Sequence, residues 1–301
     1  MTTFVPGPVS VRVPASSANL GSGFDALGLA LTLYDVVTAE VVAESGEPVI
    51  TVTGEGAGAV PLDASHLVLA SMAAGLEAMG SSLPAVRLAC KNAIPHGRGL
   101  GSSAAAIVAG LELARRAVSD GADRMPDEQL LGLAAGIEGH PDNVAAALLG
   151  GLTIARTTTD GARAVRLEVA EPLSCIACVP PEAVATEVAR GLLPATVPHA
   201  DAAHAVGRTA LLVAALTGRP DVLLDATEDR LHQDYREPAM PDSLELVRSL
   251  RAAGIAAVVS GGGPTVLAMS GTDRVVLPDD LAPVGWRVLQ LSVDRAGATM
   301  L

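Results

Sequence analysis

The stretch that decides the fold is PHGRGLGSSAAAIVAG, residues 95–110. Glycine occupies every second position from 97 to 101, and two serines and a run of small apolar residues follow. The preceding segment AVRLACKN (85–92) alternates like a strand, and a helical pattern extends from residue 102 to about residue 118. The stretch is therefore a strand, a glycine-rich turn and a helix N-terminus in succession.

This order of elements is a recurrent way to bind phosphate. The first N–H groups of a helix have no intrahelical partners, and the helix dipole adds partial positive charge there. Glycines let the backbone approach a ligand closely, and Ser102 and Ser103 supply hydroxyls for a phosphate, a metal ion or the helix cap. Taken alone, the cluster also fits an ordinary strand–turn–helix with a serine cap. It is neither a Walker A loop, since no lysine follows the last glycine, nor a Rossmann motif, which needs glycine at Ser102.

Composition limits the classes of function. The chain has 301 residues, half of them hydrophobic, and a net charge of −13. That charge opposes general binding to nucleic acid or anionic membranes, and one Trp, two Tyr and two Phe are too few for base-stacking platforms. No apolar run approaches the roughly 18–20 residues of a membrane helix, and the N-terminus lacks the pattern of a signal peptide. We expect a soluble, cytoplasmic protein with no nucleic-acid or membrane partner.

The three cysteines, Cys90, Cys175 and Cys178, are an odd, small set that suggests a reducing compartment. Cys175 and Cys178 have C-x-x-C spacing, which occurs in redox and metal sites. The segment LSCIACVPP is typical of a buried strand, however, and residues three apart on a strand point to opposite faces. We therefore predict structural thiols.

The pattern of elements predicts an α+β protein of two domains, with a boundary between residues 155 and 170. Strands and helices are interleaved without regular βαβ units, and a small-residue loop is expected over residues 15–28. Strands are expected at 9–14, 29–43 (as one or two strands), 85–92, 150–156, 162–170, 174–181, 255–260, 265–270 and 286–293, and helices at 65–80, 102–118, 127–139 and in pieces between 182 and 253.

Four segments resemble one family. PHGRGLGSSAA (95–105) is similar to the P-x-x-x-G-L-G-S-S-A-A signature of the GHMP small-molecule kinases, and SGGGPTVLA (260–268) to their C-terminal glycine-rich motif. SSANLGSGFDALG (16–28) and EGHPDNVAAALLGG (138–151) resemble the homoserine kinase branch. These motifs occur in family order over nearly the whole chain. The resemblance implies a two-domain GHMP kinase fold, with a ribosomal protein S5 domain 2-like ATP-binding domain over 1–160 and a ferredoxin-like domain over 161–301.

The resemblance also implies ATP and Mg²⁺. Glu138 matches the metal-binding glutamate of the family and would hold Mg²⁺ together with Ser103, with Ser102 as the alternative serine. Alone, Glu138 would read as a solvated carboxylate at a helix end. The implied ATP-binding residues are Pro95, His96, Gly97, Arg98, Gly99, Leu100, Gly101, Ser102, Ser103, Ala104, Ala105, Gly261, Gly262 and Gly263.

The implied second substrate is L-homoserine. Arginine binds carboxylates through bidentate contacts, and two arginines match family positions. The implied substrate-binding residues are Arg190 and Arg236 at the carboxylate, Asn19 and Asp25 at the ammonium and polar end, and His140 and Asn143 at the hydroxyl end. Each of these has an ordinary structural interpretation when taken alone, such as a turn former or a surface arginine.

The implied catalytic residues are Asn143, Glu138 and Ser103. Mevalonate kinase and galactokinase use an aspartate as general base with a basic partner, but the aligned position here is Asn143. The only lysine, Lys91, precedes the glycine-rich turn on a strand. We therefore expect no early deprotonation, and the substrate hydroxyl would lose its proton late in a loose transition state. Asp142 remains the alternative base.

The resulting expectation is transfer of the ATP γ-phosphoryl group to homoserine, a step towards threonine, by a homodimer. Another GHMP small-molecule kinase and a non-catalytic GHMP-fold binding protein are the alternatives. Relatives often have an asparagine near the adenine where this chain has His66 in SHLVLA. That departure leaves the contact with the base open.

Overall fold

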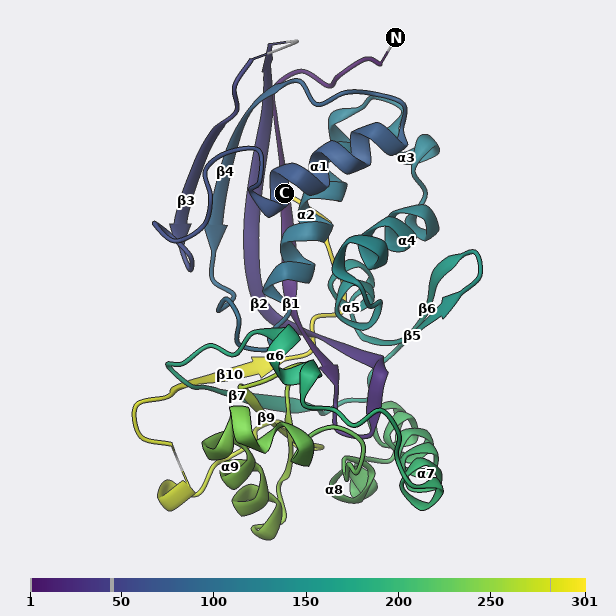
Figure 1. Cartoon of the computed structure of the whole chain (residues 1–301), viewed down its shortest axis with the longest axis vertical. Helices are drawn as coiled ribbons and strands as arrows, with labels where there is room; N and C mark the ends of the chain where they lie inside the picture. Colours follow the sequence, from purple (N-terminus) through teal and green to yellow (C-terminus); the bar gives the residue numbers. More distant parts are fainter. Residues whose placement is uncertain (1, 44–45, 282) are drawn as a thin grey trace.

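The computed structural model describes residues 2–43, 46–281 and 283–301. Two domains lie one above the other along the long axis of the molecule (Figure 1). Within the described residues, the upper domain has a seven-stranded sheet and the lower domain a four-stranded sheet. The arrangement is the α+β, two-domain organisation that the sequence predicts.

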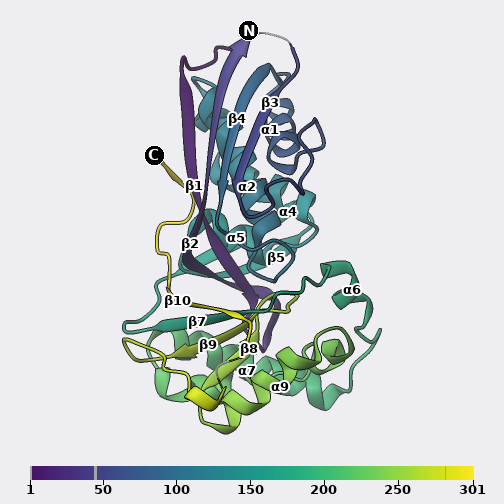
Figure 2. The same ribbon diagram turned by 90° about the vertical axis from the view of Figure 1, so that its left-hand side faces the viewer.

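The upper sheet runs in the order β11-β1-β2-β4-β3, and β5 pairs with the lower part of β2 and with β6. Neighbouring strands are antiparallel except β3 and β4. Helices α1, α2, α4 and α5 lie against one face of this sheet (Figures 1 and 2). The elements are β1 (Pro8–Asn19), β2 (Gly23–Ala43), β3 (Val49–Gly54), α1 (Leu67–Ala78), β4 (Ala85–Asn92), α2 (Ser102–Ala117), α3 (Gly121–Arg124), α4 (Asp127–Glu138), α5 (Asp142–Leu149), β5 (Leu152–Thr158), β6 (Gly161–Leu167) and β11 (Thr299–Met300).

The lower sheet is antiparallel in the order β10-β7-β9-β8. Numbered along the chain this is 4-1-3-2, the arrangement of a ferredoxin-like βαββαβ unit, in which the short 3-10 turn η3 stands in the second helical connection. Helices α7, α8 and α9 lie on the side away from the upper domain (Figure 1). The elements are β7 (Ser174–Val179), α6 (Thr186–Gly191), α7 (His199–Thr217), η1 (Pro220–Val222), α8 (Leu223–Ala226), η2 (Asp234–Ala239), α9 (Pro241–Ala252), β8 (Ala256–Val259), β9 (Val266–Ser270), η3 (Asp279–Leu281) and β10 (Arg287–Ser292).

The loop expected over residues 15–28 is wrong. Residues 15–19 continue β1 and residues 23–28 begin β2, which then runs unbroken to Ala43. Small residues look like a loop in sequence, but residues 15–23 are buried at the domain junction, where larger side chains would not fit. Strand β3 and helix α5, which carry short or weakly periodic patterns, were not predicted.

The two ends of β1 and β2 at this turn reach down into the lower domain (Figure 1). A Cβ on Gly21 would lie 2.4 Å from the carbonyl oxygen of Thr227, so the turn packs directly on the backbone there. Ser22 Oγ donates to the carbonyl of Ala226 at 3.0 Å. The upper sheet therefore supplies part of the lower domain's surface, and residues of both domains meet at this junction.

The division at residues 160/161 stays a prediction. Residues 161–167 form β6, which pairs with β5 as part of the upper sheet, and the C-terminal strand β11 returns to pair with β1. We propose the boundary after Leu167, because a cut at 160 would separate a hairpin from its partner strand.

Cys175 and Cys178 lie on β7 and pack in different hydrophobic clusters on its two faces, as the strand period requires. Burial raises the pKa of Cys175 to about 12 and that of Cys178 to about 11.

In the part of the chain that the structure describes, none of the helices combines the length and apolar character needed to cross a membrane.

Candidate active site

A cavity of about 240 Å³ lies where the two domains meet, and it gathers most of the predicted site residues. Both domains contribute to its walls: β1, β2 and the glycine-rich turn from above, and α6, η2 and the turn before β9 from below. The predicted residues that line it are Asn19, Asp25, Gly97, Arg98, Gly99, Gly101, Ser102, Ser103, Glu138, His140, Asn143, Arg190, Arg236, Gly261 and Gly262.

The glycine-rich turn has the conformation that its glycines allow. Gly97, Gly99 and Gly101 have φ angles of +64°, +75° and +70°, a left-handed region that costs other L-residues about 1–2 kcal/mol. Ala105 makes the first recorded intrahelical bond of α2, donating to the Gly101 carbonyl at 2.8 Å. The preceding amides, at residues 102–104, belong to the first helical turn and have no intrahelical acceptor. Of these residues, Ser102 and Ser103 line the cavity, at the positive end of α2.

The C-terminal glycine-rich segment packs against this turn. Ser260 Oγ lies 2.6 Å from the carbonyl oxygen of Gly99 and 2.8 Å from Ser17 Oγ. The Gly261 amide donates to the Ala18 carbonyl at 3.1 Å. A Cβ on Gly99 would lie only 2.2 Å from the Ser260 carbonyl oxygen, so the two backbones touch at a distance that only glycine permits. The segment closes one side of the cavity.

Ser103 and Glu138 form a pair beside the turn. Ser103 Oγ donates to Glu138 Oε1 at 2.6 Å. Burial is the main cause that raises the pKa of Glu138, opposed by this hydrogen bond. Among the described residues, no three or more His, Cys, Asp or Glu side chains gather as a metal site. Mg²⁺, however, is held by one or two carboxylates together with substrate phosphates, so the half-buried Glu138 carboxylate and the exposed Ser103 hydroxyl beside the glycine-rich turn fit that ion.

Asp25 and Arg190 form an ion pair across the cavity. Arg190 Nη1 and Nη2 donate to the two carboxylate oxygens of Asp25 at 2.9 and 2.8 Å, and this pair joins β2 to α6. Both side chains are partly exposed. The hydrogen bond to Asp25 is the main cause that raises the pKa of Arg190. Asp25 and Arg190, the two residues expected to contact the charged groups of a zwitterionic substrate, are therefore paired with each other.

Asn19 organises the turn below β1. Its Oδ1 accepts from the Asp25 amide and its Nδ2 donates to the Gly261 carbonyl, both at 2.9 Å. Asn19, Leu20 and Asp25 all have positive φ angles, between +51° and +69°. Non-glycine residues in that region store strain, which concentrates at functional sites. The side chain of Asn19 serves this backbone and joins it to the C-terminal glycine segment.

Arg236 is the buried arginine of the site, with a relative exposure of 2%. Its Nη1 donates to the Gly261 carbonyl at 2.9 Å, and its guanidinium lies 5.8 Å from the centre of the Phe24 ring. Burial, followed by the neighbouring Arg190, lowers the pKa of Arg236. Its Nε has no hydrogen-bond partner among the residues that the structure describes. A buried guanidinium with an unused donor favours binding of an anionic group.

Asp142 and Asn143 begin α5 and also line the cavity. Ser16 Oγ donates to Asn143 Oδ1 at 2.9 Å, which leaves the Nδ2 donors of Asn143 for a ligand. Asp142 Oδ1 accepts from the Asn143 amide at 2.7 Å and lies 2.9 Å from His140 Nδ1. That hydrogen bond is the main cause that raises the pKa of His140. Ser16 was not predicted as a site residue, although it begins one of the four motifs.

A second, more apolar cavity of about 260 Å³ shares Ser102 and Ser103 with the first. His66 lines it, is 5% exposed, and has no hydrogen-bond partner for Nδ1 within the described part of the chain. Burial lowers the pKa of His66, so its imidazole is neutral at pH 7. His96 and Ala105 line the same cavity. Apolar residues such as Val60 also form its walls, and the sequence contained no signal for them.

Some predicted ATP-binding residues support the turn from behind. Leu100 and Ala104 are fully buried in the core. The Arg98 guanidinium donates to the carbonyls of His96, Pro180 and Pro181, and so braces the turn against the lower domain. Pro95 lines a separate surface hollow with Pro180 and Pro181.

Gly263 supports the first cavity from the C-terminal glycine-rich segment, and two residues of α6 line it. Gly263 belongs to the tight turn of the C-terminal segment, since its amide donates to the Ser260 carbonyl at 2.8 Å. Thr186 and Glu187 line the cavity although the sequence analysis did not select them. Their types carry no signal without the fold.

Comparison with known proteins agrees with this geometry. The family model described as GHMP kinases N terminal domain matches residues 66–151, and the one described as GHMP kinases C terminal matches residues 211–276. The first match contains the glycine-rich turn and α5, and the second contains η2 and the C-terminal glycine segment. The chain belongs to the GHMP kinase family, and the predicted two-domain GHMP kinase fold is confirmed.

The relatives are homoserine kinases. The chain is 52% identical over 293 residues to the homoserine kinase of Streptomyces coelicolor, covering 97% of this chain and 94% of that protein. It is 53% identical over 293 residues to that of Streptomyces avermitilis, covering 97% and 95%. The crystal structure of homoserine kinase from Cytophaga hutchinsonii superposes with a TM-score of 0.82 at 26% identity, covering 99% of both chains. Within the GHMP kinases, the chain therefore groups with the homoserine kinases.

Proposed function

We propose that this chain transfers the γ-phosphoryl group of ATP to the side-chain hydroxyl of L-homoserine, giving O-phospho-L-homoserine on the way to threonine. The observation that carries the proposal is one cavity lined by three groups: the start of α2, whose first amides have no intrahelical acceptor, the Ser103–Glu138 pair, and Arg190 with Arg236. Phosphoryl transfer is mainly positioning and charge neutralisation. This cavity offers both.

ATP would bind across the two cavities. The amides at residues 97–104 would cradle the triphosphate, as helix N-termini do, and the apolar cavity beside Ser102 and His66 would take the base. Mg²⁺, held by Ser103 and Glu138, would supply charge neutralisation at the phosphates. A cation would also offset the cost of desolvating the Glu138 carboxylate, which raises the pKa of that group. The chain's own contribution is a preorganised set of hydrogen-bond donors.

Homoserine would replace the ion pair between Asp25 and Arg190. A zwitterion carries both charges, so its carboxylate would satisfy Arg190 and its ammonium would satisfy Asp25 when their mutual contact opens. Arg236 would add a second, buried contact to the carboxylate through its unused donors. The exchange leaves both Asp25 and Arg190 with an opposite charge, so binding leaves neither of them uncompensated.

The hydroxyl end offers donors to the substrate. Asn143 presents Nδ2 because its Oδ1 accepts from Ser16, and an amide N–H orients an oxygen but does not take its proton. Asp142 Oδ1 already contacts His140 Nδ1 and accepts a hydrogen bond from the Asn143 backbone amide. We propose that the proton leaves late, towards the transferring phosphoryl group. Asp142→Asn is expected to retain turnover; loss of turnover with both binding constants intact would identify Asp142 as a base.

The test of function is an ADP-release assay with L-homoserine, mevalonate, galactose and shikimate. We expect release with homoserine alone, and Arg236→Ala is expected to raise the KM for homoserine strongly with little change in that for ATP. Release with another alcohol would assign a different GHMP kinase activity. ATP binding without release would favour a non-catalytic protein.

Two further expectations complete the proposal. We propose a cytoplasmic location, and fractionation of cells tests it. A homodimer rests on the family resemblance, and analytical ultracentrifugation at micromolar concentration tests it.

A further inference from the structure

Arg236 is held by a histidine four residues earlier in the chain. His232 is fully buried, and its ring stacks on Phe24 with centroids 5.0 Å apart. His232 Nδ1 lies 3.1 Å from Arg236 Nη1, and His232 Nε2 lies 2.8 Å from the carbonyl oxygen of Gly21. The imidazole therefore bridges a site arginine and the turn between β1 and β2.

These two contacts fix the protonation state of the ring. A carbonyl oxygen only accepts, so Nε2 must carry a proton, and a guanidinium only donates, so Nδ1 must offer its lone pair. A doubly protonated ring would set two donors, Nδ1–H and Nη1–H, against each other. Burial is the main cause that lowers the pKa of His232; the Asp229 carboxylate, with Oδ2 3.6 Å from Nε2, opposes it, and the charge of Arg236 adds to it. His232 is thus a neutral imidazole in the Nε2–H tautomer.

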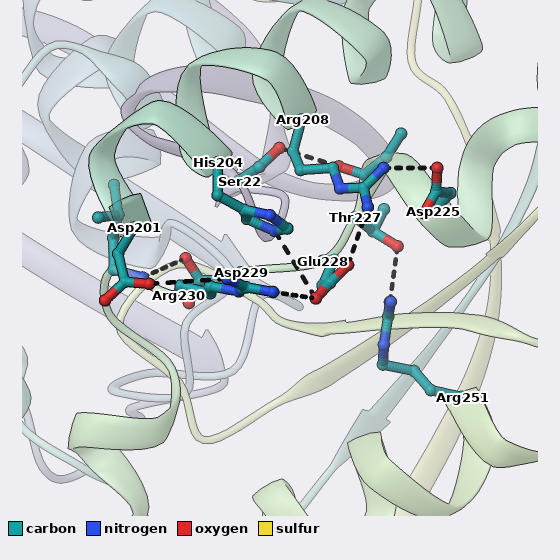
Figure 3. Close-up of polar contacts among 12 residues, drawn as sticks. Ser22, Asp201, His204, Arg208, Asp225, Thr227, Glu228, Asp229, Arg230 and Arg251 are labelled. Atoms are coloured by element: carbon teal, nitrogen blue, oxygen red, sulfur yellow. Dashed lines mark hydrogen bonds and ion pairs between the residues drawn. The ribbon is translucent and has the colours of Figure 1, made fainter. Parts of the chain in front are cut away.

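The segment that carries His232 is anchored from behind. The Asp229 carboxylate accepts from the backbone amides of His232 and Gln233 at 3.1 and 2.8 Å. Glu228, which precedes Asp229, pairs with Arg208 at 3.1 Å, and Arg208 also pairs with Asp225 (Figure 3). Beside this network, Arg251 donates to the Thr227 hydroxyl. The imidazole is therefore held on a rigid support and does not simply follow the arginine.

We propose that His232 is a positioning residue, which orients the Arg236 guanidinium towards the substrate carboxylate and ties it to the β1–β2 turn. The inference rests on the proposed role of Arg236 in binding homoserine. Arg236 Nη1 gives its hydrogens to His232 and to the Gly261 carbonyl. With Nη1 occupied on both sides, the remaining donors of the guanidinium stay available for the ligand.

A matched pair of variants separates the two contacts. Asparagine places its amide where the Nδ1 edge of the ring lies, so His232→Asn keeps an acceptor for Arg236 and loses Gly21. Glutamine reaches the Nε2 position, so His232→Gln keeps a donor for Gly21 and loses the acceptor. Both variants lose the stack on Phe24. Any purely structural effect of removing the ring is thus common to both.

We expect the KM for homoserine to rise about ten-fold with His232→Gln, the size of one lost hydrogen bond to a charged group, and clearly less with His232→Asn. The KM for ATP should be alike in the two variants. In an Arg236→Met background, the Gln/Asn difference in kcat/KM should vanish because no guanidinium remains to be oriented. Equal homoserine KM values, the reverse order, or a difference that survives Arg236→Met would overturn the inference.

One measurement is independent of catalysis. The ¹⁵N NMR spectrum of the wild type, with the His232 ring assigned by through-bond correlation to its own backbone, should show a neutral Nε2–H ring at pH 7. A charged ring or the Nδ1–H tautomer would refute the inference even if the variants fail to fold. Absence of ADP release from the wild type with homoserine would instead refute the proposed function.

Discussion

The contact between the glycine-rich turn and the C-terminal glycine segment can be tested at Gly99. A Cβ at this position would lie 2.2 Å from the Ser260 carbonyl oxygen. Gly58 offers a matched control, because its φ is also +75° but a Cβ there would have no neighbour within 4 Å. Gly99→Ala and Gly58→Ala therefore carry the same backbone strain, about 1–2 kcal/mol, and differ in the clash alone.

The expected size of the effect follows from that distance. The turn and the Ser260 backbone must separate by about 1 Å to reach van der Waals contact. The shift would also stretch the hydrogen bond from Ser260 Oγ to the Gly99 carbonyl, now 2.6 Å long. A 1 Å misplacement of a positioning element costs about 10²-fold in turnover, or about 2.7 kcal/mol of barrier. We expect Gly99→Ala to lose that much kcat/KM for ATP and Gly58→Ala to stay near the wild type.

The assay is ADP release at saturating homoserine with varied ATP, with urea unfolding of each variant as the measure of stability. Both alanine variants should lose a similar amount of free energy of unfolding from backbone strain, with any further loss in Gly99→Ala reporting the clash. If Gly99→Ala kept the activity of Gly58→Ala, the close approach of the two segments would not position the phosphate-binding turn, and the reasoning would fail.

Three further outcomes are expected. Burial raises the pKa of Glu138 above its ordinary value of 4.5, so the folded chain loses stability as pH rises through the raised value. Glu138→Gln removes this carboxylate and should therefore raise the Tm of the protein without ligands at pH 7. The gain in Tm should disappear below pH 4.5, where the carboxyl group is neutral in both the folded and the unfolded chain. Cys175 and Cys178, with pKa values near 12 and 11, should resist a thiol reagent at pH 8 until urea unfolds the chain. Arg115→Met should cost about 3–5 kcal/mol in urea unfolding, because it leaves the buried Glu112 carboxylate without its main partner.

Much of the fold could be predicted because its signals are local. The helix beginning at Ser102 and the strands around Cys175 and Val266 follow from periodicity, and the turn at Gly99 follows from residue type. The loop expected over residues 15–28 failed for a physical reason: small, buried residues look like a loop in one dimension. Their strand conformation is fixed by β-sheet partners elsewhere in the chain.

The site also has features that the sequence predicted and contacts that only the structure shows. The resemblance selected Asn19, Arg190 and Arg236, and the cavity contains them, but the pairing of Arg190 with Asp25 was not foreseen. The role of Ser16 as the partner of Asn143 was likewise invisible. These are side-chain contacts between distant segments, and a sequence pattern describes only the segment in which it occurs.

The sequence by itself predicted the glycine-rich turn, since alternating glycines before a helix permit the left-handed backbone that the turn adopts, and the first turn of a helix leaves its amides unpaired. It also determined the order of the motifs and hence the family. Only the tertiary structure decided which groups face one another: the Asp25–Arg190 pair spans 165 positions and the His232–Gly21 contact spans 211. Such contacts depend on how two domains dock, and docking is set by the shape of buried surfaces that no single stretch of residues encodes.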